Sequence, residues 1–324
     1  MDRRQFLLNS IALGSVAALG NSLTAAAASR RKSADALLDT GANELQDALQ
    51  ISHLTADLSV IMGAGGNIAV LKLNEGGPLQ IDSGLANRSV DIAKAVTEVA
   101  GAPAGMLVNT HWHFDHTGGN EAIGKTHATI IAHSACRSRL SSDQMVEFLK
   151  MKCPASPEVA LPIATFTDSF SIYTGGHEIA LTHVQPAHTD TDIFVHFKKE
   201  NVIHAGDLMF NGFFPFIDYS TYGWIGGMVA AADRILKIAN ADTRIIPGHG
   251  PIASRADLVA FRDMLHTVQT RLEKLIEVGH KPEQISSAKP LADLDAKWGG
   301  GFMKADAFTV CAAEGIVRHK SLKG

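Results

Sequence analysis

The stretch Thr-His-Trp-His-Phe-Asp-His-Thr-Gly-Gly-Asn at residues 110–120 constrains the chain more than any other. His111 and His113 are two positions apart, so an extended backbone points both imidazole rings to the same side. Asp115 and His116 follow directly, where the chain must turn. This short segment can therefore offer two nitrogen ligands to one metal ion, and an oxygen and a nitrogen ligand to a second. Zinc suits these donors, and manganese, iron and cobalt accept them too.

Three further residues of the same chemical types occur later in the sequence. His188 lies in Pro-Ala-His-Thr-Asp, Asp207 in His-Ala-Gly-Asp-Leu, and His249 in Pro-Gly-His-Gly-Pro. Each follows an apolar, strand-like run, and we expect each to lie in a turn. The alternative is that residues 110–120 form a polar loop of ordinary hydrogen-bonded histidines. The matching residues downstream favour a metal centre over that alternative.

The motif HxHxDH, followed by a His, an Asp in a Gly-Asp step and a His in Pro-Gly-His-Gly, resembles the metallo-β-lactamase superfamily. The resemblance covers about residues 55–265. It implies an α/β (α+β) fold in which two mixed β-sheets form a four-layer αββα sandwich. The order of predicted elements, strands then helix and strands then helix again, indicates the same architecture.

The resemblance also implies a role for each matched residue. Three histidines would bind the first metal ion, a second set of three residues would bind the other, and one carboxylate would bridge them. In that order, the residues are His111, His113 and His188; Asp115, His116 and His249; and Asp207. Asp82, in Asp-Ser-Gly after a predicted strand, would orient a ligand histidine. Its alternative role is to cap a turn or helix.

The implied activity is that of a metal-dependent hydrolase, expected to hold two zinc ions. Two cations that share a water lower its pKa from about 15.7 towards about 7 and so supply hydroxide at neutral pH. That hydroxide would attack the carbonyl of an ester, lactone, thioester or amide. Asp115 is the candidate catalytic residue because it can accept a proton as the intermediate collapses. No serine or cysteine nucleophile is needed.

Two alternative activities share parts of this motif set. A periplasmic metallo-β-lactamase is the first, although Asp207 stands where one lactamase class has a cysteine ligand. A mono-iron persulfide dioxygenase is the second, and it would leave the second metal position empty. The presence of His116 and His249 favours the hydrolase over the dioxygenase. A non-catalytic binding protein is disfavoured because the ligand set is complete.

The first residues resemble an export signal of the twin-arginine type. Arg3 and Arg4 precede an apolar run at residues 7–19 and a small-residue context at residues 25–28. The run is short and contains glycine, so we expect no stable membrane anchor in the mature form. We predict removal of residues 1–28 and a periplasmic or secreted location.

Four segments are predicted along the chain: 1–28, the signal; 29–54, a lead-in with a short helix at 42–49; 55–280, the metallo-β-lactamase-fold domain; and 281–324, a C-terminal extension. Within the domain we predict helices at 89–100, 134–150, 226–239 and 256–278. Residues 151–177 are rich in Pro, Thr and Ser, and we expect them to lie outside the core. Strands are predicted at 58–62, 68–73, 79–82, 106–108, 129–132, 178–184, 192–197 and 202–205.

Composition excludes some partners. The formal charge is -4 and no basic stripe is present, so we expect a small-molecule substrate and no nucleic acid. The three cysteines show no CxxC pattern. Cys136 and Cys153 have two interpretations, a disulfide in an oxidising compartment or separate buried thiols. The sequence gives no indication of oligomeric state.

An aromatic segment follows Asp207. Seven of the chain's 20 aromatic residues lie at residues 210–224. They are expected either to form a structural loop or to form an apolar wall over the metals. In the second case Asn211, Tyr219 or Tyr222 would orient a substrate carbonyl. The histidines at positions 127, 133, 183, 196 and 204 are expected to be packing or surface residues.

Overall fold

The first of two facing β-sheets is built from the N-terminal half of the chain. The computed structural model describes residues 48–322. In spatial order the strands of the first sheet are β1 (Gln50–His53), β2 (Leu58–Met62), β3 (Ile68–Leu71), β4 (Leu79–Ile81), β5 (Met106–Val108), β6 (Thr129–His133) and β9 (Ala164–Phe166). The strands from β1 to β4 pair antiparallel, and those from β4 to β9 pair parallel.

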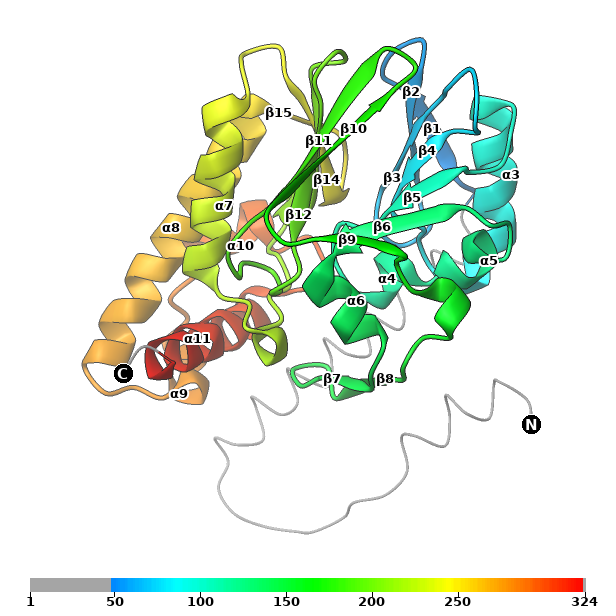
Figure 1. Cartoon of the computed structure of the whole chain (residues 1–324). Helices are drawn as coiled ribbons and strands as arrows, with labels where there is room; N and C mark the ends of the chain where they lie inside the picture. Colours follow the sequence, from blue (N-terminus) through cyan, green and yellow to red (C-terminus); the bar gives the residue numbers. More distant parts are fainter. Residues whose placement is uncertain (1–47, 323–324) are drawn as a thin grey trace.

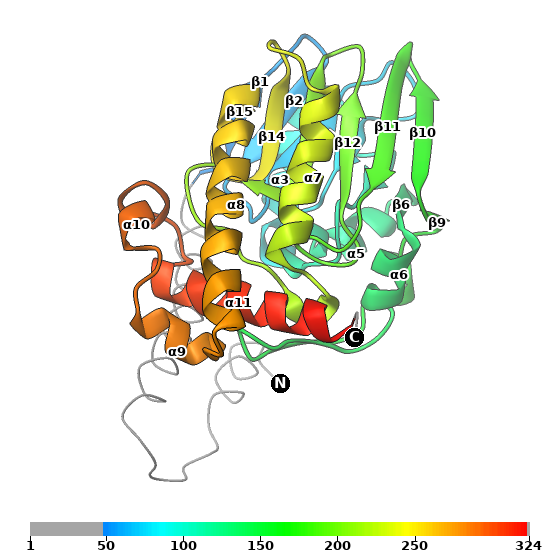
Figure 2. The same ribbon diagram turned by 90° about the vertical axis from the view of Figure 1, so that its left-hand side faces the viewer.

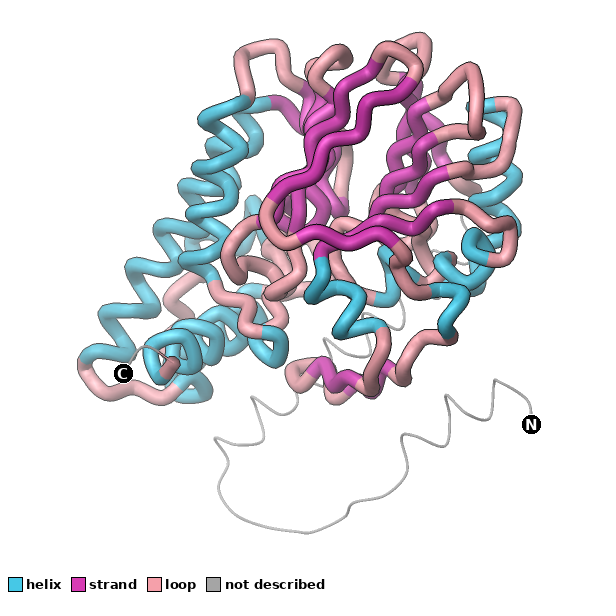
Figure 3. Tube along the Cα trace, in the orientation of Figure 1, coloured by secondary structure: helices cyan, strands magenta, loops and turns pink. Residues whose placement is uncertain are grey.

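The second sheet is built from the C-terminal half and faces the first (Figure 3). Its strands pair antiparallel except for β13 and β14, which are parallel. In spatial order they are β10 (Ser169–Thr174), β11 (His177–His183), β12 (Ile193–Phe197), β13 (Val202–Phe210), β14 (Arg244–His249) and β15 (Ala253–Ser254). A separate hairpin joins β7 (Gln144–Val146) to β8 (Met151–Cys153).

Apolar side chains fill the space between the sheets. Val60 and Ile81 of the first sheet belong to the same buried cluster as Leu181 and Val195 of the second. Successive side chains of a strand point to opposite faces, so the remaining positions are available to the outer helices. Ile61 and Val70 accordingly face the other way.

Helices cover the outer face of each sheet (Figure 1). On the first sheet lies α3 (Ser89–Ala100), whose Ile92 and Val96 repeat at helical spacing and are buried against it. On the second lie α7 (Ile225–Ile238) and α8 (Arg255–Glu277), and the latter begins with a capping box between Ser254 and Asp257. Shorter helices are α4 (Phe114–Thr117), α5 (Asn120–Gly124) and α6 (Ser134–Leu140), with 3₁₀ turns η1 (Ala86–Arg88), η2 (Glu158–Ala160) and η3 (Tyr219–Thr221).

The C-terminal extension is helical and shares the core of the second half. It consists of α9 (Pro282–Ser287), α10 (Ala292–Trp298) and α11 (Ala305–Ser321). Figure 2 shows α11 running across the lower ends of α7 and α8. Phe308 and Cys311 of α11 are fully buried in one cluster with Phe214 and Leu272. The extension is therefore packed against the fold rather than detached from it.

The predicted four-layer αββα sandwich is confirmed, with some boundaries corrected. The helix predicted at 134–150 ends at Leu140, and the β7–β8 hairpin follows. Residues 151–177 do not lie outside the core as predicted. Strand β9 of this segment belongs to the first sheet, and β10 belongs to the second. A three-residue strand such as β9 carries too little alternation to be recognised among prolines and serines. The first sheet already begins at Gln50, before the predicted start of the core.

Other sequence predictions concern termini and cysteines. The export signal lies outside the described residues, as does most of the helix predicted at 42–49. Among residues 48–322, no helix is long and apolar enough to cross a membrane. Cys136 and Cys153 are both free thiols in this part of the chain, which agrees with the second of their two interpretations.

Candidate metal centre

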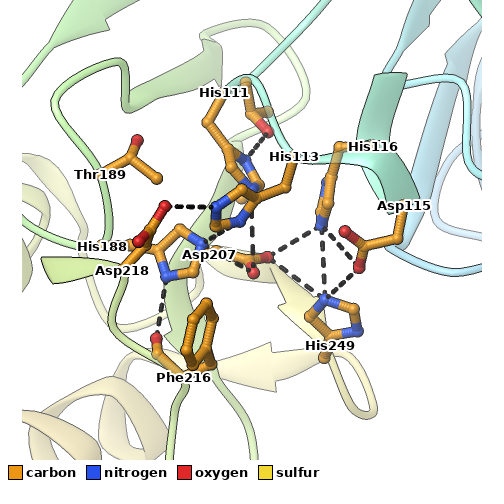
Figure 4. Close-up of polar contacts among 12 residues, drawn as sticks. His111, His113, Asp115, His116, His188, Thr189, Asp207, Phe216, Asp218 and His249 are labelled. Carbon is orange, nitrogen blue, oxygen red and sulfur yellow. Dashed lines mark hydrogen bonds and ion pairs between the residues drawn. The ribbon is translucent and has the colours of Figure 1, made fainter. Parts of the chain in front are cut away.

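The seven predicted ligands come from both sheets and meet in one place (Figure 4). Four follow the buried strand β5: His111 in a bend rather than on the predicted extended backbone, His113 on extended backbone, and Asp115 and His116 on α4. The other three come from the second sheet: His188 lies between β11 and β12, Asp207 within β13, and His249 at the last position of β14. The prediction that each of these three lies in a turn is thus wrong for His249 and Asp207, both of which are strand residues, and Asp207 lies beside a register irregularity of β13 at Gly206.

The first group of potential ligands consists of three histidines and a carboxylate. His188 Nε2 lies 2.8 Å from His113 Nδ1. Asp207 Oδ2 lies 3.3 Å from His188 Nε2 and 3.9 Å from His111 Nε2. The four side chains are buried, and one potential ligand atom from each lies within 4.8 Å of the others. This group is the position predicted for metal one.

The second group consists of Asp115, His116 and His249. Asp115 Oδ2 lies 3.2 Å from His249 Nε2 and 3.7 Å from His116 Nε2. The other oxygen of Asp207, Oδ1, lies 3.0 Å from His116 Nε2 and 3.5 Å from His249 Nε2. Each Asp207 oxygen thus faces a different group, which is the arrangement that a bridging carboxylate requires.

These residues fit a pair of divalent cations. His111 Nε2 and Asp207 Oδ1 are buried without a hydrogen-bond partner among the described residues, and such atoms are costly unless something else binds them. His113 and His188 also bring two ring nitrogens to 2.8 Å of each other. Imidazole nitrogens and carboxylate oxygens are the donors that zinc takes in catalytic sites.

The outward-facing ring nitrogen of each buried ligand histidine has a partner. Oriented rings of this kind are typical of metal sites, where the partner fixes the tautomer. The pairs are His111 Nδ1 with Thr110 Oγ1 at 3.1 Å, His113 Nε2 with Asp218 Oδ2 at 3.1 Å, His116 Nδ1 with Asp82 Oδ2 at 2.8 Å, and His188 Nδ1 with the Phe216 carbonyl at 2.8 Å.

Asp82 has the geometry of the orienting carboxylate that the resemblance implied. Besides His116, it accepts hydrogen bonds from the Thr110 backbone N–H and hydroxyl, both at 2.7 Å. Its φ of 61° is uncommon for a residue other than glycine, and the cost of that conformation is offset by three buried interactions. Asp82 therefore links two ligand histidines, His116 directly and His111 through Thr110.

The two groups differ in charge. Burial lowers the pKa of His188 to about 4, and it lowers the pKa of His111 well below its usual range. Burial also lowers the pKa of His249, but the carboxylates of Asp207 and Asp115 outweigh burial and raise it to about 10. Burial raises the pKa of Asp115, yet His116 and His249 prevail and lower it to about 2. Without metal, His111 and His188 of the first group are therefore neutral, whereas Asp115 and His249 of the second form an ion pair.

Two glycines let the backbone approach the ligands closely. A Cβ at Gly66 would lie 2.1 Å from His116 Cε1, and one at Gly248 would lie 1.9 Å from Asp207 Oδ1. Gly118 and Gly119, which follow HxHxDH in the sequence, do not have this role. Their Cβ positions instead meet backbone atoms of residues 83–86, so they allow α4 to pack on that loop.

The aromatic segment 210–224 contacts the candidate ligands of both groups. Phe216 has its ring centroid 6.0 Å from that of His113 and 5.9 Å from that of His188, and Phe210 stacks on His249 at 5.2 Å. Asn211, a candidate to orient substrate, donates its side-chain amide to the Pro251 carbonyl. Of the other two residues predicted as candidates to orient a substrate carbonyl, Tyr219 is buried and Tyr222 is exposed.

Sequence reasoning missed three polar residues that hold the ligands. Asp218 lies in the aromatic segment and bonds His113. Asp192 accepts from the backbone N–H groups of His188 and Thr189, both at 2.8 Å. Asn67 bonds the loop that carries His249. For Asp218 the one available signal was a polar side chain among apolar residues, and nothing in the sequence connects Asp218 or Asn67 to a histidine far along the chain. Asp192 lies four residues after His188 and carried no signal of its own.

The centre opens to solvent at one side. The side chains of Asp115 and His249 are 20% and 19% exposed, whereas those of the other five ligands are 6% exposed or less. Within residues 48–322, the side of the centre that faces solvent is therefore the one formed by Asp115 and His249. The histidines predicted to have no ligand role, such as His133 and His183, lie outside both groups.

The chain has curated relatives of low identity. It is 24% identical over 158 residues to acyl-coenzyme A thioesterase MBLAC2 of Bos taurus, which is 44% of this chain and 55% of that protein. It is 24% identical over 191 residues to the protein of the same name from Gallus gallus, covering 53% and 68%. The chain thus spans little more than half the length of the bovine relative.

Solved structures share the fold. A metallo-β-lactamase from Pontibacter korlensis superposes with a TM-score of 0.54 at 16% identity, over 67% of this chain and 99% of that one. The stereoselective inverting sec-alkylsulfatase Pisa1 from Pseudomonas sp. gives 0.61 at 17% identity, over 85% and 51%. Residues 62–254, more than half of the chain, match the metallo-β-lactamase superfamily. The resemblance to this superfamily that the sequence motifs indicated is confirmed. The chain belongs to the metallo-β-lactamase superfamily.

Proposed function

We propose that this protein is a binuclear zinc hydrolase that cleaves a small acyl compound, with a thioester as the first substrate class to test. The observation that carries the proposal is the position of Asp207. Its two oxygens face two separate ligand groups, one on each side, in a site that opens beside Asp115 and His249. A site of this kind is suited to water activation rather than to structural metal binding, which closes the coordination shell.

Each part of the site has a chemical task. Bound cations would acidify a water and polarise the substrate carbonyl. The residues of the first group are rigid and buried, so they hold their positions while substrate enters and product leaves. Asp115 is at the solvent opening, and its carboxylate is ionised, so it can accept a proton from the attacking water and pass it to the leaving group. Phe216 lines the first group with apolar surface beside His188, and Phe210 does the same for the second group beside His249.

A pocket next to the HxHxDH segment supports an acyl substrate, although none of the seven candidate ligands lines it. It has a volume of about 250 Å³, and Phe114 in its wall precedes Asp115 in the sequence. Its lining is mostly apolar and includes Trp112, Phe114, Leu140, Met151 and Cys153. A pocket of this composition can bind the hydrocarbon part of an acyl group. The relatives named as acyl-coenzyme A thioesterases support the same substrate class.

The test combines metal content with a substrate panel. Elemental analysis of the purified protein should give near two zinc per chain. The panel would contain an acyl-coenzyme A thioester, an acyl lactone, a cephalosporin, an aryl phosphodiester and an alkyl sulfate. Turnover of the thioester that Asp115→Asn reduces by at least a hundredfold is the expected result. If the protein binds two zinc ions but hydrolyses only the cephalosporin, its activity is that of a lactamase and the thioesterase proposal is wrong.

The identity of the metal separates the hydrolase from the redox alternative. One equivalent of iron per chain, together with oxygen uptake that depends on a persulfide, would contradict the proposal. The second ligand group argues for two cations, because Asp115, His116 and His249 offer a complete set of donors. Zinc is proposed because both groups combine imidazole with carboxylate.

We also propose that the protein is exported to the periplasm or secreted, on the evidence of Arg3-Arg4 and the apolar run that follows. Replacing both arginines by lysine should leave the precursor in the cytoplasm. Cell fractionation with an antibody measures this. Unchanged export of the double variant would contradict a twin-arginine signal.

A further inference from the structure

The segment between β13 and α7, residues 211–224, contacts two ligands of the first group. Asp218 is buried, and its Oδ2 accepts a hydrogen bond from His113 Nε2 at 3.1 Å. The other nitrogen of that ring, Nδ1, faces His188. Since Nε2 keeps its proton for Asp218, the lone pair of Nδ1 is directed into the site. Asp218 thus determines which tautomer His113 presents to a metal.

The Asp218 carboxylate is itself held in place. Oδ2 also accepts from the Thr221 hydroxyl at 2.8 Å, and Oδ1 accepts from the Ser220 backbone N–H at 3.0 Å and from the Ser220 hydroxyl. With these partners the carboxylate cannot turn away from His113. The backbone N–H of Asp218 donates to the His188 carbonyl at 2.9 Å. One residue therefore fixes the ring of His113 and the backbone of His188.

Helix α11 of the C-terminal extension packs against this segment. The Cys311 thiol donates to the carbonyl of Ile217, the residue before Asp218, at 3.1 Å. Phe308 stacks on Phe214 with ring centroids 4.9 Å apart, and the Arg318 guanidinium lies 4.4 Å from the Tyr219 ring centroid. Three residues of α11 thus contact the segment on both sides of Asp218. All three lie outside residues 62–254, the part of the chain that matches the superfamily.

We propose that Asp218 is a positioning residue for the first metal and that α11 keeps the Asp218 segment aligned with His113 and His188. The proposal rests on the proposed metal-dependent function, because it concerns how ligands for that metal are held. It also assigns a role to the C-terminal extension. Without the contacts of α11 to this segment, His113 and His188 would lose their support, although α11 itself contacts neither histidine.

Zinc affinity of the purified protein tests the role of Asp218. Titration against a competing chelator should show that Asp218→Ala binds one of the two zinc equivalents about 10- to 100-fold more weakly, the loss typical of removing such a partner. Asp218→Asn keeps an acceptor oxygen and should restore part of the affinity. Circular dichroism and thermal unfolding of the metal-free variants show whether they are folded. If folded Asp218→Ala binds both equivalents as the wild type does, the positioning role is wrong.

The role of α11 has its own variants. Cys311→Ala removes the donor to Ile217 and should weaken one zinc equivalent about two- to tenfold, while Cys311→Ser keeps a donor and should lose less. Cys136→Ala is the matched control, because Cys136 is also a buried thiol but lies in the α6 part of the core. Equal zinc affinities for the Cys311→Ala and Cys136→Ala variants would contradict the role of α11.

The two proposals can fail separately. Wild-type protein that binds no zinc contradicts the proposed function, and the positioning role with it. Wild-type protein that binds two zinc ions, with variants that match it, contradicts the positioning role and leaves the hydrolase intact. Because affinity is measured without substrate, the result does not depend on which acyl compound the enzyme cleaves.

Discussion

The two halves of the molecule supply ligands in opposite ways. The N-terminal half delivers His111, His113, Asp115 and His116 from one short segment after β5. The C-terminal half delivers His188 from the loop between β11 and β12, Asp207 from β13 and His249 from β14. A local motif needs one strand and one turn to be correct, whereas scattered ligands need the whole second sheet to be in register. The second half should therefore be the more sensitive to changes far from the metals.

The supports of the ligands differ in the same way. In the N-terminal half, Asp82 of the neighbouring strand end serves His116 and, through Thr110, His111. In the C-terminal half, His188 is held by the segment 211–224, which in turn depends on α11. His113 is the exception, since it belongs to the first half but is oriented by Asp218 of the second. The two halves are thus joined through His113 as well as through Asp207.

The largest effect is expected at Asp207, where both groups meet. Asp207→Ala removes an oxygen from each group at once and leaves His116 and His249 without the carboxylate that faces them. We expect the loss of both zinc equivalents and of nearly all turnover. Elemental analysis after dialysis, with activity on the best panel substrate, measures this. A variant that keeps one full equivalent would show that Asp207 serves a single metal.

The next largest effect is expected at Asp82. Asp82→Ala leaves His116 Nδ1 and the buried N–H of Thr110 without their acceptor. Zinc affinity should fall about 10- to 100-fold, chiefly at the second position. Asp82→Ala should weaken the zinc ion at the second position, whereas Asp218→Ala should weaken the one at the first. Asp263→Ala, an exposed carboxylate on α8, is the control and should bind zinc as the wild type does. If the Asp82 and Asp218 variants lose the same equivalent, the division of supports between the metals is wrong.

Asn67 tests how one half holds a ligand of the other. It comes from the loop between β2 and β3, and its side chain donates to the carbonyls of Pro247 and Gly250 on either side of His249, both at 2.9 Å. Asn67→Ala leaves these carbonyls unpaired, at a cost of about 1–3 kcal/mol in unfolding free energy for the buried one. Urea unfolding of the metal-free protein measures the cost, and zinc titration should show a several-fold loss.

A matched variant isolates the donors of Asn67. Asn67→Asp has nearly the same size, but its carboxylate cannot donate to either carbonyl. It should therefore destabilise at least as much as alanine does. An aspartate variant with wild-type stability and zinc affinity would show that Asn67 fills space rather than holding the His249 loop.

The comparison also explains what the sequence could and could not reveal. HxHxDH was recognisable because local backbone geometry alone places His111 and His113 together. His188, Asp207 and His249 were recognised only through their resemblance to a family, since nothing local links them. Asp218 and Asn67 were missed because their partners lie far away in sequence, and only the packed fold brings them within hydrogen-bond distance. Asp192 lies only four residues after His188, and its contact is made by the local turn. The short strands β7 to β9 were missed because three residues carry no clear period.

The smallest effect concerns a contact between the two sheets that involves no metal ligand. His133 of β6 and His183 of β11 stack with ring centroids 3.8 Å apart and an interplanar angle of 9°. Burial and the neighbouring His133 lower the pKa of His183 to about 4. Below the usual pKa of about 6.5, the unfolded chain takes up a proton that folded His183 does not, so stability should fall between pH 6.5 and 4.

The measurement is the pH dependence of unfolding free energy in the wild type and in His183→Gln. The glutamine does not titrate, so the difference between the two proteins should change by about 1–2 kcal/mol from pH 7 to pH 4.5, a figure reduced for the solvent that still reaches the rings. The wild type should lose stability relative to the variant as the pH falls. A difference that stays constant over this range would mean that His183 takes up its proton equally in the folded and unfolded states. The contact between the sheets would then tolerate a charged pair.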